Sequence, residues 1–302
     1  MDIPEPYLGR IRALYPDLAI SSLHVDSDGL INNVYIVNNE FVFRFAKNEA
    51  AQQSLAVEVK VLDLARNYLD MPIPFFEHSE PDFVVYRMIP GEPLYRNDIL
   101  RLDETIQDRV AEQLATFLRQ LHAIPINEFD SYAIHQSDPA QNLARCKHLY
   151  QDVEQELFPY LMTMAKDWVR QHFAPVLTGT LSLEYTPALI HDDIAPYHIL
   201  FNRADQRISG VIDFGTASIN DPAGDFALIV DAYGENFLRR MSKFYPAIEE
   251  ALDRARFYAG LLELQWALAG IRTHDLTWLV CQIGRTREVM PIGYRESNTP
   301  WF

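Results

Sequence analysis

The sequence contains few of the residues that mark secreted, zinc-binding or membrane proteins. Its 302 residues include only two cysteines, Cys146 and Cys281, which lie far apart. They make neither a disulfide framework nor any zinc-site spacing. No apolar run reaches the roughly 20 residues that span a bilayer. The first residues, Met-Asp-Ile-Pro-Glu, lack the basic and apolar regions of a signal peptide. We therefore expect a cytoplasmic protein with no membrane partner.

Positive charge is also scarce. The chain has 26 Lys and Arg residues against 42 Asp and Glu residues, which gives a net charge of −16. Because binding to nucleic acid needs a basic face, nucleic acid is not an expected partner. An acidic protein attracts cationic small molecules and also stays soluble, and the charge alone leaves both uses open. The 48% hydrophobic and 23% charged composition is that of a soluble globular protein, which we expect to be a monomer.

The front of the chain has the pattern of a small antiparallel sheet with one helix. Runs of β-branched and aromatic residues predict strands, and Asn38-Asn39 is a turn signal that joins two of them in a hairpin. The spacing of apolar residues predicts a helix from Ala50 to Tyr68. The predicted strands cover residues 18–25, 33–37, 41–45 and 83–88.

The segment Ile89-Pro-Gly-Glu-Pro93 ends this pattern, and we interpret it as a domain boundary. Beyond it the apolar spacing is mostly helical. The helical runs cover 104–123, 139–173 (two helices) and 225–300, and Trp266 in the last run is assigned to the core. The sequence predicts an α+β protein with a lobe of residues 1–89 and a helical lobe of residues 90–302.

Three polar residues, Asp193, His198 and Asp213, stand beside short apolar runs in the stretch from Leu189 to Asp225. Such runs are typical of short buried strands that present polar groups at their ends. We therefore expect the three side chains to meet in one pocket. A His-x-Asp or an Asp-Phe-Gly tripeptide alone arises by chance, but the two together, each after an apolar run, form a specific signal.

This set of residues suits metal-assisted phosphoryl transfer from a nucleotide. That reaction needs placement of the phosphates, metal ions between them, and an acceptor for the proton of the substrate hydroxyl. Asp193 can accept the proton. Asp213 supplies a carboxylate for Mg²⁺, which prefers oxygen ligands, and His198 is a less favoured second ligand.

The front lobe adds candidate phosphate-binding residues. Arg44 lies inside an apolar strand, where a charge without a partner would be costly. An ion pair with Glu58 of the following helix would satisfy both charges; alternatively, Glu58 faces solvent and Arg44 reaches out to water. Asp28 and Gly29 lie where a glycine-rich loop would cover a triphosphate. The order of loop, basic strand residue, helix Glu, His-x-Asp and Asp-Phe-Gly is that of protein kinases.

These motifs, with Ile-Pro-Gly-Glu at the boundary and Asp-Pro-x-x-Asp after Asp-Phe-Gly, resemble the aminoglycoside phosphotransferase family, and most closely its 2''-phosphotransferases. The resemblance spans nearly the whole chain. The stretches that carry it are Phe41-Val-Phe-Arg-Phe-Ala-Lys, Tyr185-Thr-Pro-Ala-Leu-Ile-His, Asp193-Ile-Ala-Pro-Tyr-His-Ile-Leu, Val211-Ile-Asp-Phe-Gly and Gly234-Glu-Asn-Phe.

The resemblance implies a two-lobed, protein-kinase-like fold with ATP or GTP in the cleft and two Mg²⁺ ions. Asp193 becomes the catalytic base and Asp213 the principal metal ligand. His198 falls where most of the family has Asn, although 2''-type and macrolide relatives can carry His there. Arg44 and Glu58 match the phosphate-binding pair.

The resemblance also assigns residues that the motifs alone do not. Residues 85–88, with Tyr86 and Met88, become the hinge that contacts the nucleobase. Asp225 becomes a brace of the catalytic loop.

For the acceptor, Glu235 matches a carboxylate that meets substrate amines, and Asp192 and Glu263 are further candidates. Where relatives place carboxylates on the later helix, this chain has Leu262 and Ala269.

The function expected from these observations is a Mg²⁺-dependent small-molecule O-phosphotransferase acting on a cationic, aminoglycoside-like acceptor. Two alternatives stay open. The apolar positions 262 and 269 would also suit a macrolide or metabolite kinase. The sparse glycine loop and His198 would also suit a kinase-shaped protein that binds nucleotide without turnover.

Overall fold

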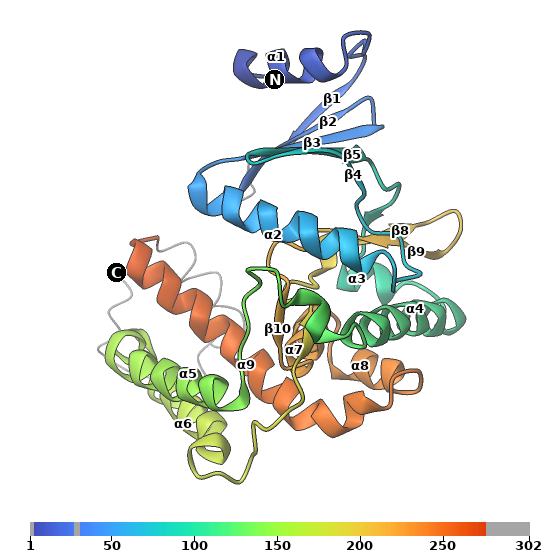
Figure 1. Cartoon of the computed structure of the whole chain (residues 1–302). Helices are drawn as coiled ribbons and strands as arrows, with labels where there is room; N and C mark the ends of the chain where they lie inside the picture. Colours follow the sequence, from blue (N-terminus) through green and yellow to red (C-terminus); the bar gives the residue numbers. More distant parts are fainter. Residues whose placement is uncertain (1–2, 27–30, 276–302) are drawn as a thin grey trace, which may run out of the picture.

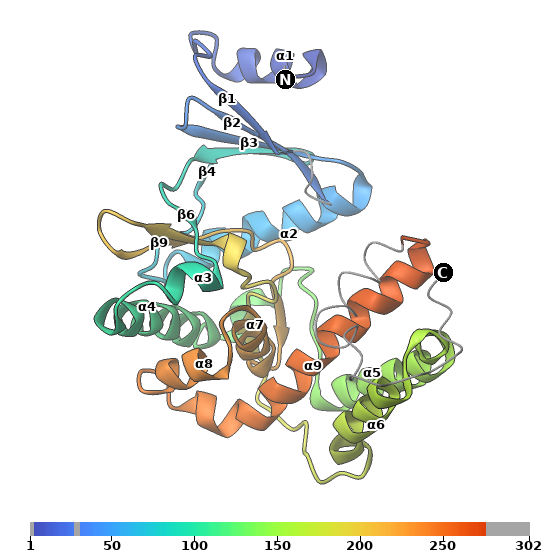
Figure 2. The same ribbon diagram turned by 180° about the vertical axis from the view of Figure 1, so that it is seen from behind.

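The computed structural model describes residues 3–26 and 31–275. In this part of the chain, five antiparallel strands form a sheet in the order β1-β2-β3-β5-β4. The sheet lies between α1 (Glu5–Leu14) and α2 (Glu49–Ala65), as both ribbon views show (Figures 1 and 2). Its strands are β1 (Leu23–Asp26), β2 (Asn32–Val37), β3 (Phe41–Ala46), β4 (Phe76–Glu80) and β5 (Phe83–Arg87).

The alternation of strand side chains separates an aromatic face, packed against α1, from a second face turned towards α2. Phe43 and Phe45 of β3 are buried against α1 together with Phe83 of β5. Arg44, between the two phenylalanines, therefore points to the opposite face, towards α2. The register pairs Arg44 with Val34 on one side and Val84 on the other. This alternation places a buried cation on the face of the sheet turned towards α2, between Val34 and Val84.

The connection after β5 joins the sheet to the rest of the molecule. Glu92 and Pro93 form β6, which pairs with β8 rather than with the front sheet. Among the described residues, β6, β8 (Ile199–Asn202) and β9 (Arg207–Val211) form one small sheet, and β7 (Ala188–Ile190) pairs with β10 (Ser218–Asn220). A boundary at residue 89 stays a prediction, supported by the end of β5 at Arg87 and by the pairing of β6.

Helices make up most of the remainder, as expected for an α+β fold. Helix α4 buries the apolar stripe that its sequence predicts, including Val110, Leu114 and Leu118. The helices are α3 (Arg96–Ile99), α4 (Glu104–His122), α5 (Pro139–Asp152), α6 (Thr163–Leu177), α7 (Ala223–Tyr233), α8 (Glu235–Ser242) and α9 (Ala247–Thr273). None of the described helices is long and apolar enough to cross a bilayer.

Two differences from the sequence analysis concern the helical part. The predicted helical run of residues 139–173 is helical for more of its length than two helices, because a π-helical turn (Val153–Leu157) and a 3-10 turn (Phe158–Tyr160) continue from α5. Trp266 is 40% exposed, so its assignment to the core is wrong. It lies on α9, and apolar content alone did not show which face of that helix turns outward.

Gly210 in β9 allows the hinge segment to approach the strand that leads to Asp213. A Cβ atom at this position would lie 2.8 Å from both Ile89 Cγ2 and Pro72 O. The neighbouring Val211 N–H donates to the same Pro72 carbonyl at 3.0 Å. Glycine is therefore required here by close packing of two backbone segments.

We expect Gly210→Ala to lower the free energy of unfolding by about 1–3 kcal/mol, because the added methyl group overpacks this contact. Gly9→Ala is the matched control. Gly9 lies in α1, where an added methyl group would meet no other atom within 4 Å, and alanine favours helix by up to about 1 kcal/mol. Urea unfolding of both variants measures the difference, and equal stabilities would contradict the packing argument.

Candidate active site

The loop after β7 is fixed by one buried carboxylate, Asp225, in the first turn of α7. Its Oδ2 accepts the backbone N–H of His191 at 3.0 Å, and its Oδ1 accepts that of Asp192 at 2.9 Å. His122 Nε2 lies 2.9 Å from Oδ2. Burial alone would raise the pKa of Asp225, but the hydrogen bond and charge of His122 and the contacts with His191 lower it. The predicted role of Asp225 as a brace is confirmed.

His191 is buried in the same loop and makes structural hydrogen bonds. Its Nε2–H donates to the carbonyl of Ile212 at 3.2 Å, and its Nδ1 accepts the N–H of Asp193 at 3.3 Å. Burial lowers its pKa to about 4, so the ring is neutral at physiological pH. The ring thus connects the loop of Asp193 to the strand end that carries Asp213.

His198 lies between the two acidic side chains that the sequence predicts beside it. Its Nδ1–H donates to the backbone carbonyl of Asp193 at 2.8 Å and lies 3.6 Å from the Asp193 carboxylate. Its Nε2 lies 3.4 Å from Asp213 Oδ2. Since the carbonyl of Asp193 accepts the Nδ1 proton, Nε2 is the ring atom that faces Asp213. Nε2 donates to that carboxylate when it carries a proton, and it presents a lone pair once that proton is lost. The predicted convergence of the three side chains is therefore confirmed as geometry.

Asp213 occupies a backbone conformation that aspartate tolerates better than most residues. Its φ is 68°, in the left-handed region. Burial would raise its pKa, yet the hydrogen bond from His198 and the charge of Arg44 lower it well below its usual range. Burial raises the pKa of Asp193, an effect that His198 partly opposes. The two carboxylates thus differ: Asp213 holds its charge firmly, whereas Asp193 accepts a proton more readily.

Arg44 supplies the positive charge that faces Asp213. Its Nη1 donates to Glu58 Oε1 at 2.8 Å, and its Nη2 lies 3.7 Å from Asp213 Oδ1. Arg44 is 5% exposed and Glu58 is fully buried, so the predicted ion pair is confirmed. The same Glu58 oxygen accepts the Phe214 N–H at 3.3 Å.

A second contact joins α2 to the Asp-Phe-Gly turn. Ser54 Oγ, which the sequence analysis missed, donates to the Gly215 carbonyl at 2.6 Å. Ser54 precedes Glu58 by four residues, so both side chains lie on one face of α2. One helix face therefore holds both Arg44 and the turn that carries Asp213.

The predicted hinge residues lie close to this centre. Tyr86 is buried, and burial together with the nearby acidic groups raises its pKa to about 12 despite the Arg44 cation. The Met88 N–H already donates to the Glu40 carbonyl at 2.8 Å. A backbone N–H that binds a nucleobase would therefore have to come from a hinge residue other than Met88. Asp28 and Gly29 lie outside the described residues.

The three substrate candidates differ in their surroundings. Asp192 accepts the Ser218 hydroxyl at 3.1 Å, and its desolvated position near Asp225 raises its pKa to about 7. The carboxylate of Glu235 is already bound by Arg256 at 2.7 Å and Arg239 at 2.9 Å, which lower its pKa to about 2. Glu263 is half-buried on α9.

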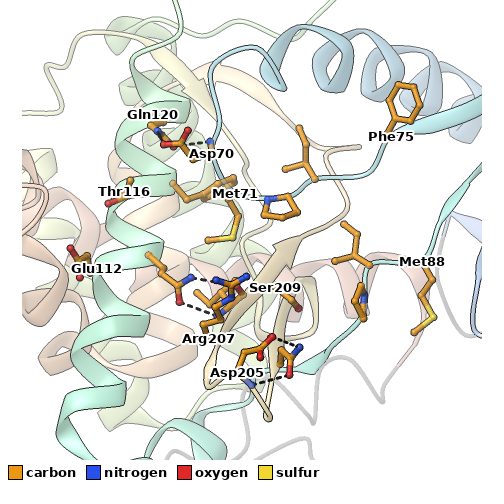
Figure 3. A pocket seen from close by; sticks show the side chains of 18 of the residues that line it. Asp70, Met71, Phe75, Met88, Glu112, Thr116, Gln120, Asp205, Arg207 and Ser209 are labelled. Atoms are coloured by element: carbon orange, nitrogen blue, oxygen red, sulfur yellow. Dashed lines mark hydrogen bonds between the residues drawn. The ribbon is translucent and has the colours of Figure 1, made fainter.

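A large cavity lies beside the hinge, and Figure 3 shows side chains that line it. It measures about 820 Å³ and is bounded by Met71, Ile73, Ile89, Gln113 and Ser209, among others. Among the described candidate residues, Met88 lines it, whereas the Asp193–His198–Asp213 cluster does not. Its walls come from the segment between α2 and β4, the hinge, α4 and the β8–β9 hairpin, so it adjoins the predicted hinge through Met88.

Comparison with known proteins agrees with this geometry. A family model described as the phosphotransferase enzyme family matches residues 22–266. The viomycin phosphotransferase of Streptomyces vinaceus is 29% identical over 288 residues, which cover 91% of this chain and 96% of that protein.

Solved structures extend the likeness to the fold. The GDP and kanamycin complex of the aminoglycoside phosphotransferase APH(2")-IIIa is 28% identical, with a TM-score of 0.83 over 93% of this chain and 96% of that one. The macrolide 2'-phosphotransferase MphH of Brachybacterium faecium has a TM-score of 0.71 at 20% identity, over 91% and 96% of the two chains. The predicted kinase-like fold is confirmed, and the chain belongs to the phosphotransferase enzyme family.

Proposed function

We propose that this protein transfers the γ-phosphoryl group of a nucleoside triphosphate to a hydroxyl group of a cationic antibiotic, such as an aminoglycoside or a basic peptide. The observation that carries the proposal is the meeting of Asp193, His198 and Asp213 opposite the buried Arg44. Relatives that act on viomycin and bind kanamycin support the acceptor class. The net charge of −16 is consistent with a cationic acceptor.

The phosphates of the donor would lie between the two faces of the cleft. Arg44 is held by Glu58 and lies 3.7 Å from Asp213, so its guanidinium is fixed before the nucleotide arrives. A pre-positioned cation stabilises the charge of a transferring phosphoryl group without reorganisation. The hinge after Tyr86 would bind the nucleobase, and the predicted loop of Asp28 and Gly29 would cover the phosphates.

The donor is proposed to be GTP as well as ATP. Neighbouring structures at 28% identity are GDP complexes, and an ADP complex is found at 22% identity. Parallel assays with both nucleotides distinguish the two donors.

The residues present fit a Mg²⁺ ion held jointly by protein and nucleotide. The described residues contain no group of three or more His, Cys, Asp or Glu side chains that could hold a metal by themselves. Mg²⁺ in phosphoryl-transfer enzymes usually takes one or two protein ligands and completes its shell with phosphate oxygens and water. Asp213 and His198 Nε2, 3.4 Å apart, supply that number. When bound, the ion would neutralise negative charge on the phosphates.

Asp193 is the proposed general base. The acceptor hydroxyl oxygen attacks the γ-phosphorus, its proton passes to the Asp193 carboxylate, and the bond from the γ-phosphorus to the bridging β-phosphate oxygen breaks. The raised pKa of Asp193 favours its acceptance of that proton. His198 keeps the Asp193 loop in place through the backbone carbonyl.

We expect Asp193→Asn to lower kcat by about 10²- to 10⁴-fold, because the proton acceptor is lost while the shape is kept. Nucleotide affinity measured by calorimetry stays within about twofold, since Asp193 makes no proposed phosphate contact. Asp63→Asn, an exposed carboxylate on α2 paired with Arg66, is the matched control and keeps its activity. Full activity of Asp193→Asn on an antibiotic panel would rule out its role as base.

The metal proposal predicts opposite effects of two substitutions. Asp213→Asn should raise the Mg²⁺ concentration for half-maximal binding to the nucleotide complex by at least about tenfold. His198→Asn should lower it, because an amide oxygen suits Mg²⁺ better than an imidazole nitrogen does. Calorimetric Mg²⁺ titration of each nucleotide complex measures both. A Mg²⁺ dependence that neither substitution changes would place the ion elsewhere.

A further inference from the structure

We propose that Tyr95 and Tyr197, here called the tyrosine pair, form a wall of the acceptor site and bind an ammonium-bearing part of the acceptor on their rings. This inference rests on the proposed function and identifies residues that recognise its substrate class. The tyrosine pair is not among the residues that the sequence motifs assign.

The first member, Tyr197, is part of the loop that carries the proposed base. It lies four residues after Asp193 and directly before His198. Its ring meets the His198 ring nearly at right angles, with a centroid distance of 4.4 Å. Tyr197 nevertheless stays 50% exposed, whereas His198 is 8% exposed. The contact thus fixes the direction of Tyr197 and leaves half of its surface open beside the reacting groups.

The second member, Tyr95, is brought to the same place by the backbone. The Leu94 N–H donates to the carbonyl of Pro196 at 3.1 Å and to that of Ile199 at 3.0 Å. The Leu94 carbonyl accepts the Tyr233 hydroxyl of α7 at 2.6 Å. Leu94 and Pro196 are thus joined by a backbone hydrogen bond. Tyr95 directly follows Leu94 and Tyr197 directly follows Pro196, so the backbones of the two tyrosines lie close together. Tyr95 is 51% exposed.

Negative charge around the tyrosine pair selects the class of ligand. The Tyr197 ring packs on His198, and the His198 ring nitrogens lie 3.6 Å from the Asp193 carboxylate and 3.4 Å from that of Asp213. The faces of aromatic rings attract cations, and the nearby carboxylates strengthen that attraction for an ammonium group. A neutral apolar ligand would bury the rings but gain nothing from these charges.

Glu235, the carboxylate predicted to contact amines of the acceptor, is less available for binding than its sequence position indicates. Glu235 is already paired with Arg239 and Arg256. The Arg96 guanidinium also packs against the adjacent Gly234, where a Cβ would lie 2.9 Å from its Nη2. The carboxylate of Glu235 is thus already engaged by two arginines, so an ammonium group of the acceptor would gain little from it.

Steady-state kinetics of the full chain with kanamycin and with viomycin tests the inference. We expect Tyr197→Leu to raise the KM for the acceptor by about 5- to 30-fold, with kcat and the nucleotide KM within about twofold. Tyr197→Phe keeps the ring and should behave like the wild type. Tyr68→Leu changes an exposed tyrosine in the turn after α2 and is the matched control. Thermal unfolding checks that each variant is folded.

The outcomes separate the inference from the proposed function. If the wild type transfers phosphate but Tyr197→Leu has an unchanged KM for the acceptor, the proposed role of the tyrosine pair is wrong. The proposed function would still hold in that case. A rise in the nucleotide KM instead would place Tyr197 on the donor side and also overturn the proposed role of the tyrosine pair. If the wild type neither phosphorylates nor binds either antibiotic by calorimetry, both proposals fail.

Discussion

The buried guanidinium of Arg44 is the charge on which the rest of the site depends. A cation inside an apolar sheet persists only if other groups compensate for its lost hydration. Glu58 does so from α2, and Asp213 does so from the end of β9. Removing one partner of such a pair typically costs about 3–5 kcal/mol. The need for compensation therefore holds the front sheet, α2 and the Asp-Phe-Gly turn together.

The second half of the site is fixed by Asp225. Its two oxygens hold the backbone of His191 and Asp192, so the loop bearing Asp193 has little freedom. His198 then links this loop to Asp213 through its two ring nitrogens. Two buried carboxylates, Glu58 and Asp225, thus orient the residues proposed to react. Rigid support of this kind is what a reaction based on placement and electrostatics requires.

The sequence alone predicts those parts of the site that follow from the periodicity of strands and helices. Strand alternation separates Arg44 from its phenylalanine neighbours, and helical spacing places Glu58 opposite it. Contacts between distant segments were not accessible in this way. The pairing of β6 with β8, which brings Tyr95 to Tyr197, depends on two segments about a hundred residues apart. The link from His122 to Asp225 has no local signal, and the exposure of Trp266 depends on which face of α9 its neighbours cover.

The most direct test of this account is a crystal structure of the protein with GDP and Mg²⁺. The account predicts a metal ion about 2.0–2.1 Å from an Asp213 oxygen, with His198 Nε2 directed at it and a phosphate oxygen within hydrogen-bonding distance of Arg44. Phosphates bound out of reach of Arg44, with no metal beside Asp213, would contradict it.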